Sequence, residues 1–181
     1  MANLTSVTVT AGVPTAGTGT VSTLDALLNL TTAVAVTPTV TASAYTANNV
    51  IGGVITFSSI IPAVAPGFNG ILQSITAKFK ATAVTGNLTV AVFKANPSNG
   101  TYTDKTAATW NSADMANLLG IYTLTTPLAI GAATMTIYNL DGIGKAFTGA
   151  STSLYAVVTV GGTPSPASTR DFTLELAVMP G

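Results

Sequence analysis

The sequence predicts an all-β protein, an antiparallel β-sandwich of the jelly-roll type with about eight strands. Val and Thr, whose branched Cβ atoms suit a pleated sheet, are abundant, whereas helix formers with long side chains are scarce. Apolar and polar residues alternate in short runs, as in strands that are buried on one face. Turn-forming Gly, Pro and Asn residues separate seven or eight such runs after residue 33, which is the strand count of a sandwich or jelly roll.

Residues 1–20 are expected to form a flexible or partner-docking arm, and residues 21–181 a single jelly-roll domain. The second half of the arm contains only Gly, Ala, Thr, Val and Pro, so it has no bulky side chain to anchor it in a core. Val13 and Pro14 are its expected partner contacts. Residues 22–30 fit either a short helix or another strand, and the sequence leaves both open.

The expected strands follow from residue 33 onward. They cover residues 33–42, 50–61, 71–81, 88–93, 121–126, 134–140, 154–160 and 171–179. Pro38 indicates an edge position for the first strand, because proline cannot donate to a neighbouring strand. Gly52 and Gly53 indicate a bulge or a close backbone approach in the second strand.

Two of these strands show a clear period of two. In 71–81, one face is expected to carry Ile71, Gln73, Ile75, Ala77 and Phe79, opposite Ser74, Thr76, Lys78 and Lys80. In 171–179, one face is expected to carry Phe172, Leu174, Leu176 and Val178, opposite Thr173, Glu175 and Ala177.

A long excursion over residues 96–110 is expected to interrupt the strands, with a short helix near 112–119 following it. Ser112 is the candidate N-cap of this helix, Asp114 lies favourably in its first turn, and Gly120 ends it.

The chain is poor in charge, and this limits its partners. Only 7% of its residues are charged, against about 25% in a typical soluble domain, and its formal net charge is zero. Six scattered Lys and Arg residues cannot form the basic face that a nucleic acid requires. Low charge also predicts poor solubility of a free monomer, so partners are expected to cover much of the surface.

A membrane span and a secretory signal are not expected either. The mean hydropathy is +0.55, but Pro, Gly, Asn and Ser break every apolar run well before the ~20 residues that a spanning helix needs. The first residues lack the basic and apolar regions of a secretory signal, so we expect a protein made in a cytosol or exported by a route that the sequence does not show.

Catalysis and metal binding are not expected. The chain has no His and no Cys, which excludes a Ser-His-Asp triad and makes a zinc site implausible. No catalytic residue, metal or cofactor is therefore assigned, and no small-molecule substrate. The sharpest enzymatic alternative is a glycosidase carboxylate pair formed by Asp104 and Asp114, and calcium at Asp104 is conceivable. The competing interpretation is that Asp104 caps a turn and Asp114 caps the helix.

Aromatic residues of the excursion offer a binding surface. Tyr102, Trp110 and Tyr122 could form a platform for sugar, or Trp110 could anchor the loop on the sandwich or at a subunit interface. Tyr102 and Trp110 are therefore expected partner contacts. The segment GIGKAFTG, which starts at Gly142, is similar to a phosphate-binding loop only superficially and is expected to connect strands.

The order of several motifs resembles the bacteriophage capsid decoration (cement) proteins, head-associated structural proteins with a jelly-roll fold. A tyrosine precedes a Gly-Gly strand opening, then an LQSI strand, then an FKANPSN loop that runs through Thr-Asp into a short acidic helix ending in Leu-Gly. The positions on this pattern are Tyr45, Gly52, Gly53, 71–75, 93–99, Thr103, Asp104, Ala113, Asp114 and Gly120. The resemblance covers about three quarters of the chain, from Tyr45 onward.

The resemblance implies a non-enzymatic virion protein made in the host cytoplasm and bound to the outer surface of the phage head. Such a protein is expected to form a homotrimer and to stabilise contacts between major capsid protein subunits. The alternative is a tail or fibre module that binds a glycan of the host surface.

Overall fold

The computed structural model describes residues 31–61, 68–82, 84–125, 127–131 and 135–181. The expected arm with Val13 and Pro14, and the ambiguous segment 22–30, lie outside the described residues.

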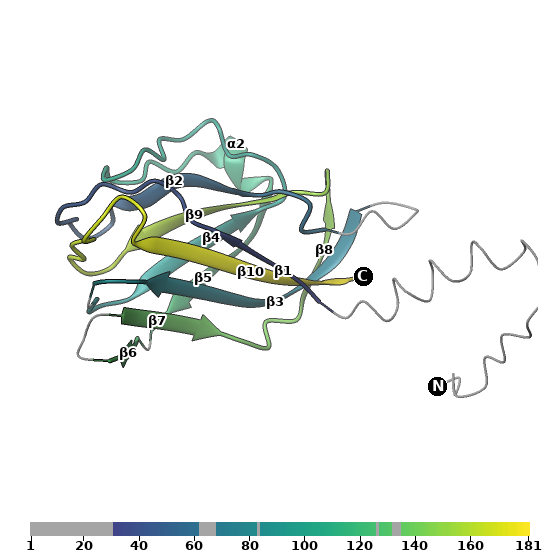
Figure 1. Ribbon diagram of the computed structural model, residues 1–181. Helices are drawn as coiled ribbons and strands as arrows, with labels where there is room; N and C mark the ends of the chain where they lie inside the picture. Colours follow the sequence, from purple (N-terminus) through teal and green to yellow (C-terminus); the bar gives the residue numbers. More distant parts are fainter. Residues whose placement is uncertain (1–30, 62–67, 83, 126, 132–134) are drawn as a thin grey trace, which may run out of the picture.

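Two antiparallel sheets pack face to face (Figure 1). The first sheet has the order β1-β10-β3-β7-β6, with β8 also pairing with β3. Its strands are β1 (Thr32–Val36), β3 (Phe68–Phe79), β6 (Leu128–Ile130), β7 (Met135–Leu140), β8 (Lys145–Gly149) and β10 (Phe172–Pro180). The second sheet has the order β2-β9-β4-β5. Its strands are β2 (Val50–Phe57), β4 (Leu88–Phe93), β5 (Leu118–Leu124) and β9 (Leu154–Val160).

The strand order is that of a jelly roll, which confirms the expected fold. The chain passes repeatedly from one sheet to the other, so β1 pairs with β10 and β2 pairs with β9. The strands β7 and β8 pair with different halves of β3, at 75–79 and 68–72, and together act as one interrupted strand. Counting them as one strand leaves the eight strands of the jelly roll and a short additional edge strand, β6.

The Gly-Gly pair near the start of β2 forms a bulge, and its backbone lies close to Pro38. The register with β9 shifts between Val50 and Val54, and Gly52 and Gly53 have φ angles of 79° and 70°. A Cβ atom on Gly52 would lie 2.5 Å from Cγ of Pro38. Pro38 follows β1, which lies at the edge of its sheet as its sequence indicates.

The strand β3 corrects one expectation. Leu72, rather than Ile71 and Gln73, points into the core with Ile75, because Leu72 and Ile75 have no exposed surface while Ile71 and Gln73 are partly exposed. The reason is a bulge: Ser74 pairs with Ala177 and Leu72 with Val178, so Gln73 is one extra residue in the strand. One inserted residue moves all side chains before it to the opposite face.

The strand β10 confirms its expected alternation. The side chains that point into the sandwich have no exposed surface; they are Phe172, Leu174, Leu176 and Val178. On the opposite face, Glu175 forms an ion pair with Lys78, whose nitrogen lies 3.0 Å from the Glu175 Oε2.

The core has two parts. The main cluster fills the space between the sheets, and its fully buried aromatic side chains include Phe57, Phe79 and Tyr138. A second cluster lies on the outer face of the β2-β9-β4-β5 sheet, where Tyr102 packs against Phe93 and its neighbours. Residues 94–117 therefore cover this face, and β4 is buried on both sides.

The expected helix is present but shorter, as α2 (Ser112–Met115). Its N-cap is Asn111 rather than Ser112, because the Asn111 side chain accepts a hydrogen bond from the Ala113 backbone N at 2.9 Å. Gly120 does not end it, since Leu118 already belongs to β5 and pairs with β4. None of the helices in the described part of the chain is long and apolar enough to cross a membrane.

Candidate functional site

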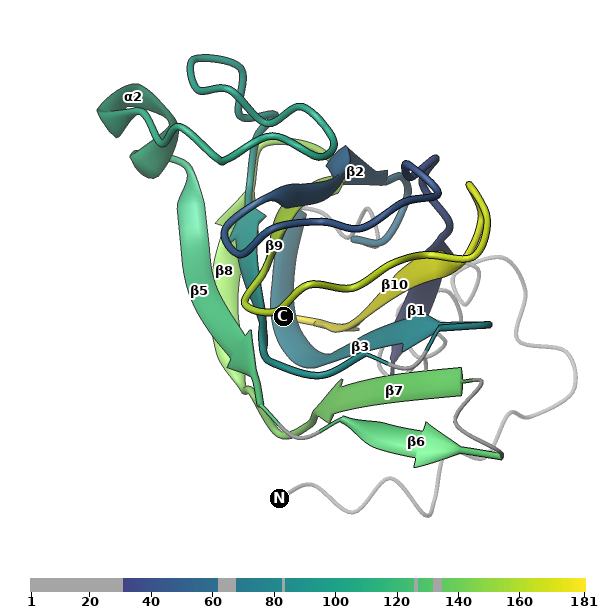
Figure 2. The ribbon, with the colours of Figure 1, turned by 90° about the vertical axis from the view of Figure 1, so that its left-hand side faces the viewer.

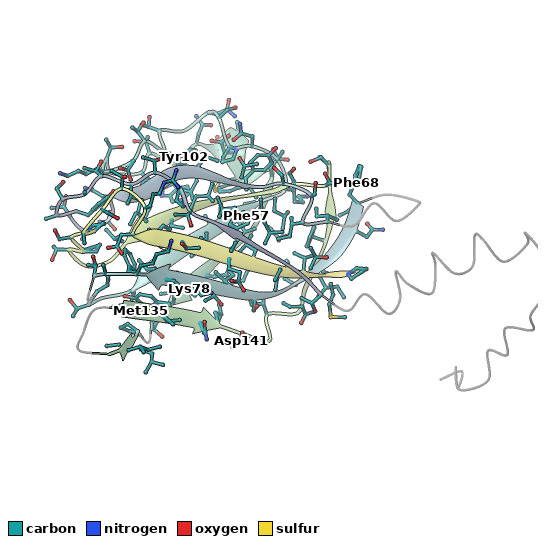
Figure 3. The ribbon with its side chains drawn as sticks, in the orientation of Figure 1. Phe57, Phe68, Lys78, Tyr102, Met135 and Asp141 are labelled. Atoms are coloured by element: carbon teal, nitrogen blue, oxygen red, sulfur yellow. The ribbon has the colours of Figure 1, made fainter. Side chains whose placement is uncertain are left out.

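The segment 94–117, here called the cover loop, joins β4 to β5 across the outer face of the second sheet. It contains the residues that the sequence singles out: Tyr102, Asp104, Trp110 and Asp114. Figure 3 shows Tyr102 on the side of the molecule that carries α2 in Figure 1.

Asp114 holds one turn of the cover loop. The residue is 2% exposed, and both of its carboxylate oxygens are occupied by donors. Oδ1 accepts from the backbone N of Ser98 at 3.1 Å and from Nδ2 of Asn99 at 2.8 Å. Oδ2 accepts from the backbone N of Gly100 at 2.8 Å and from the Tyr102 hydroxyl at 2.9 Å. Asp114 therefore caps the 98–100 turn, not the helix in which it lies.

These donors also fix the charge of Asp114. Burial raises the pKa of a carboxyl group, but hydrogen bonds from Asn99, Tyr102 and Gly100 outweigh burial and lower the pKa of Asp114 to about 2. The group is thus ionised at neutral pH, where it cannot serve as a general acid. Burial, and then the bond to Asp114, raise the pKa of Tyr102 to about 12.

Asp104 connects the cover loop to the segment before β2. Its Oδ1 accepts from the Tyr45 hydroxyl and from the Gly52 backbone N, each at 2.7 Å. Its Oδ2 accepts from the Thr41 backbone N at 2.8 Å and from the Thr41 hydroxyl at 2.7 Å. Tyr45 is 1% exposed, and burial followed by the bond to Asp104 raises its pKa well above the usual range.

The two carboxylates have no hydrogen-bond donor in common. Asp104 binds donors from residues 41–52, and Asp114 binds donors from residues 98–102. This arrangement supports the structural interpretation of both acids over a glycosidase pair. Calcium at Asp104 fits poorly too, because N–H and O–H donors surround its oxygens, whereas calcium requires further oxygen ligands.

Asp171 is a third carboxylate of this kind, and sequence reasoning missed it. The residue is 1% exposed and accepts from the Ala81 backbone N at 2.6 Å, the Ala167 backbone N at 3.0 Å and the Thr82 hydroxyl. Burial raises the pKa of Asp171, but these hydrogen bonds outweigh it and lower the pKa overall. The signal that could have found Asp171 is the scarcity of acidic residues. The chain has only six Asp and Glu residues, so each of them calls for a structural explanation.

Trp110 is the exposed end of an aromatic stack. Its ring centroid lies 5.4 Å from that of Tyr102 and 6.5 Å from that of Phe93, and the residue is 41% exposed. Tyr102 is only 6% exposed and its hydroxyl is bound to Asp114. Of the two expected contacts in the described residues, Trp110 is accessible and Tyr102 supports it from below.

The remaining candidates from the sequence form no site. In GIGKAFTG, Lys145 begins the strand β8, so no helix follows the glycines as it would in a phosphate-binding loop. A pocket of about 200 Å³ is lined by Lys94, Lys145, Leu118 and Phe147, among others, and none of the three carboxylates above contributes to it. Within the described ranges, no three His, Cys, Asp or Glu side chains gather as metal ligands would.

No protein-family model matches this sequence, and no curated protein sequence matches it either.

Proposed function

We propose that this protein is a structural protein of a phage particle that decorates the outer surface of the head and stabilises contacts between major capsid protein subunits. The observation that carries the proposal is the exposed Trp110 on a cover loop fixed by Asp104 and Asp114. Tryptophan is the side chain most enriched among residues that dominate binding energy at protein interfaces. A rigid support also reduces the entropy that is lost when it binds.

The use of charge in this molecule supports a packing role. Asp104, Asp114 and Asp171 serve as acceptors for backbone and hydroxyl donors inside the fold. Glu175 pairs with Lys78. The exposed charges that remain in the described residues are few and include Lys80, Lys145, Arg170 and Asp141. Contacts between this surface and a partner therefore depend more on buried area than on charge.

The resemblance to decoration proteins points to the same region. Gly52, Asp104 and Asp114 belong to the motif pattern, and they are also the residues that fix the cover loop. If Trp110 has a function, the residues that hold its loop in place are expected to belong to the motif pattern, as these three do.

The test is binding to capsids assembled without this protein, measured by co-sedimentation. We expect the native chain to bind and Trp110→Ala to bind at least about thirty-fold more weakly, the change that corresponds to a dominant interface residue. Ile121→Ala is the matched control, because Ile121 is 56% exposed and lies on β5. Purified particles that lack the protein, or carry it only on their tails, would overturn the proposal.

A second candidate is a tail or fibre module that binds a glycan of the host surface, because the open face of Trp110 could also stack on a sugar ring. A glycan array separates the two functions. Glycan binding that is lost in Trp110→Ala, together with no binding to capsids, would favour the second candidate.

A further inference from the structure

The hairpin formed by β6 and β7 exposes large apolar side chains at the edge of the first sheet. Leu128 is 62% exposed, Ile130 45% and Met135 36%. All three residues of β6 are exposed, so this strand lies beyond the cover of the second sheet. Figure 2 shows β6 as the outermost strand, next to β7.

These side chains share one face with Ile137. In the antiparallel register Leu128 is opposite Ile137 and Ile130 is opposite Met135, and opposed residues point to the same side of a sheet. The alternate residue of β7, Thr136, is buried on the inner side. Leu128, Ile130, Met135 and Ile137 therefore form one continuous apolar surface, here called the edge patch.

The edge patch lacks the charges that normally protect an exposed edge strand. No Lys, Arg, Asp or Glu occurs between Met115 and Leu140. Two lysines of the neighbouring strand border it: Lys78 pairs with Ile137 across β3 and β7 and is bound to Glu175, and the exposed Lys80 follows Phe79, which pairs with Thr136. Edge strands of soluble monomers usually carry charges that prevent association, and a rimmed apolar patch marks an interaction site.

We propose that the edge patch packs against the edge patch of a second copy of this chain, around the symmetry axis of the assembly. Close to a symmetry axis a residue meets its own copy, so a charge there would face an identical charge and repel it. A charge-free stretch from Met115 to Leu140 satisfies this condition. A partner with a charged surface would have to bury its charge against the edge patch, where no opposite charge is present to pair with it.

The edge patch and the cover loop, which carries Trp110, lie on opposite sides of the molecule. Figures 1 and 2 show α2 and the cover loop at one end and β6 at the other, and Figure 3 shows Tyr102 and Met135 far apart in the same sense. A chain bound to a particle through Trp110 thus keeps its edge patch free for a neighbouring copy. The inference rests on the self-association included in the expected homotrimer and names the surface that makes it.

Crosslinking through an introduced cysteine gives a direct test, because the native chain contains no Cys. We expect Ile130→Cys and Leu128→Cys, treated with a short bis-maleimide crosslinker, to yield covalent dimers. Ile121→Cys is the matched control, since Ile121 is equally apolar and exposed but lies on β5 of the other sheet. We expect no covalent dimer from it at the same protein concentration.

Sedimentation velocity supplies the second measurement. We expect the native chain to sediment as an oligomer, Ile130→Lys to dissociate with a dissociation constant raised at least about thirty-fold, and Ile121→Lys to remain associated. The substituted side chains are exposed, so all variants should keep the native melting temperature within a few degrees.

The outcomes separate the two levels of the proposal. A native chain that is monomeric overturns both self-association and the edge patch. An oligomer that persists in Ile130→Lys, or crosslinks as well through position 121 as through position 130, overturns the edge patch alone. Loss of capsid binding in Ile130→Lys with an unchanged oligomer would assign the surface to the capsid and also overturn it.

Discussion

Replacing Asp104 by Asn removes a negative charge but keeps the shape of the side chain. The carboxylate accepts four hydrogen bonds, two from backbone N–H groups and two from hydroxyl groups. An amide has one acceptor oxygen and one donor nitrogen, so in either orientation its nitrogen faces the backbone N–H of Gly52 or of Thr41. Neither backbone donor can turn away, and among the described residues only the Thr41 N–H has a second acceptor, the Tyr45 hydroxyl oxygen at 2.9 Å.

The magnitude follows from these contacts. Hydrogen bonds to a charged group contribute about 1.5–3 kcal/mol each, and a donor left unpaired costs about 1–3 kcal/mol. Asp104 is only partly buried, so water replaces some of the loss. We therefore expect Asp104→Asn to lower the free energy of unfolding by about 2–4 kcal/mol, and the melting temperature by roughly 5–15 °C.

The assay is urea unfolding followed by the fluorescence of Trp110, the single tryptophan, which lies in the same loop. The midpoint should fall while the denaturant slope stays constant. Asp141→Asn is the control, because Asp141 is exposed at the surface and its loss should change stability by less than about 0.5 kcal/mol. An Asp104→Asn variant as stable as the native chain would refute the structural role. Loss of an enzymatic activity without loss of stability would revive the carboxylate-pair hypothesis.

Three further perturbations test other contacts. Because the pKa of Asp114 lies at about 2 in the fold and ordinarily at 3.8, its stabilisation is complete above about pH 3.8 and disappears toward pH 2. The melting temperature of Asp114→Asn should thus change less with pH over this range than that of the native chain. An equal change in both would contradict this role of the Asp114 charge. Burial raises the pKa of Tyr138, and burial with the bond to Asp114 raises that of Tyr102, each to about 12. Their contribution to stability is complete below about pH 10 and disappears toward pH 12. Phenolate absorbance should therefore show both hydroxyl groups ionising above pH 10, and ionisation of both near pH 10 would contradict their burial. Gly52→Ala should destabilise the protein by about 3 kcal/mol in a thermal melt, because it combines a positive φ with a clash. Gly142→Ala, with a similar φ and open space, should cost only about 1 kcal/mol, and equal losses would remove the clash from the explanation.

Alternating strands were predictable because one face of each meets the core. The strand β9 has the bounds expected from the sequence, and β10 has the expected inner face. The strands β6 and β8 were not predicted, since β6 is exposed throughout and β8 only completes the partner of β3. The face of Leu72 depended on the bulge at Gln73, which is visible only in the pairing with β10.

The helix near 112–119 ended early for a related reason. Leu118 and Leu119 are compatible with a helix, but pairing with β4 gives the backbone of β5 its hydrogen bonds and buries Leu119. Tertiary contacts thus overrode a local preference, as they often do for weak helix formers.

The sequence by itself determined the class of this protein. Its Val and Thr content and its period of two require sheets, and the absence of His and Cys with few charges limits the chemistry available to it. Only the tertiary structure decided what Asp104, Asp114 and Asp171 do and which apolar residues of the described part stay exposed. Asp104 accepts hydrogen bonds from Thr41, Tyr45 and Gly52, which lie about fifty to sixty positions away in the chain. The strand β6 lies at the edge of its sheet, beyond β7, and all three of its residues are exposed. A local pattern cannot specify such contacts, because they depend on which distant segments the sheets bring together.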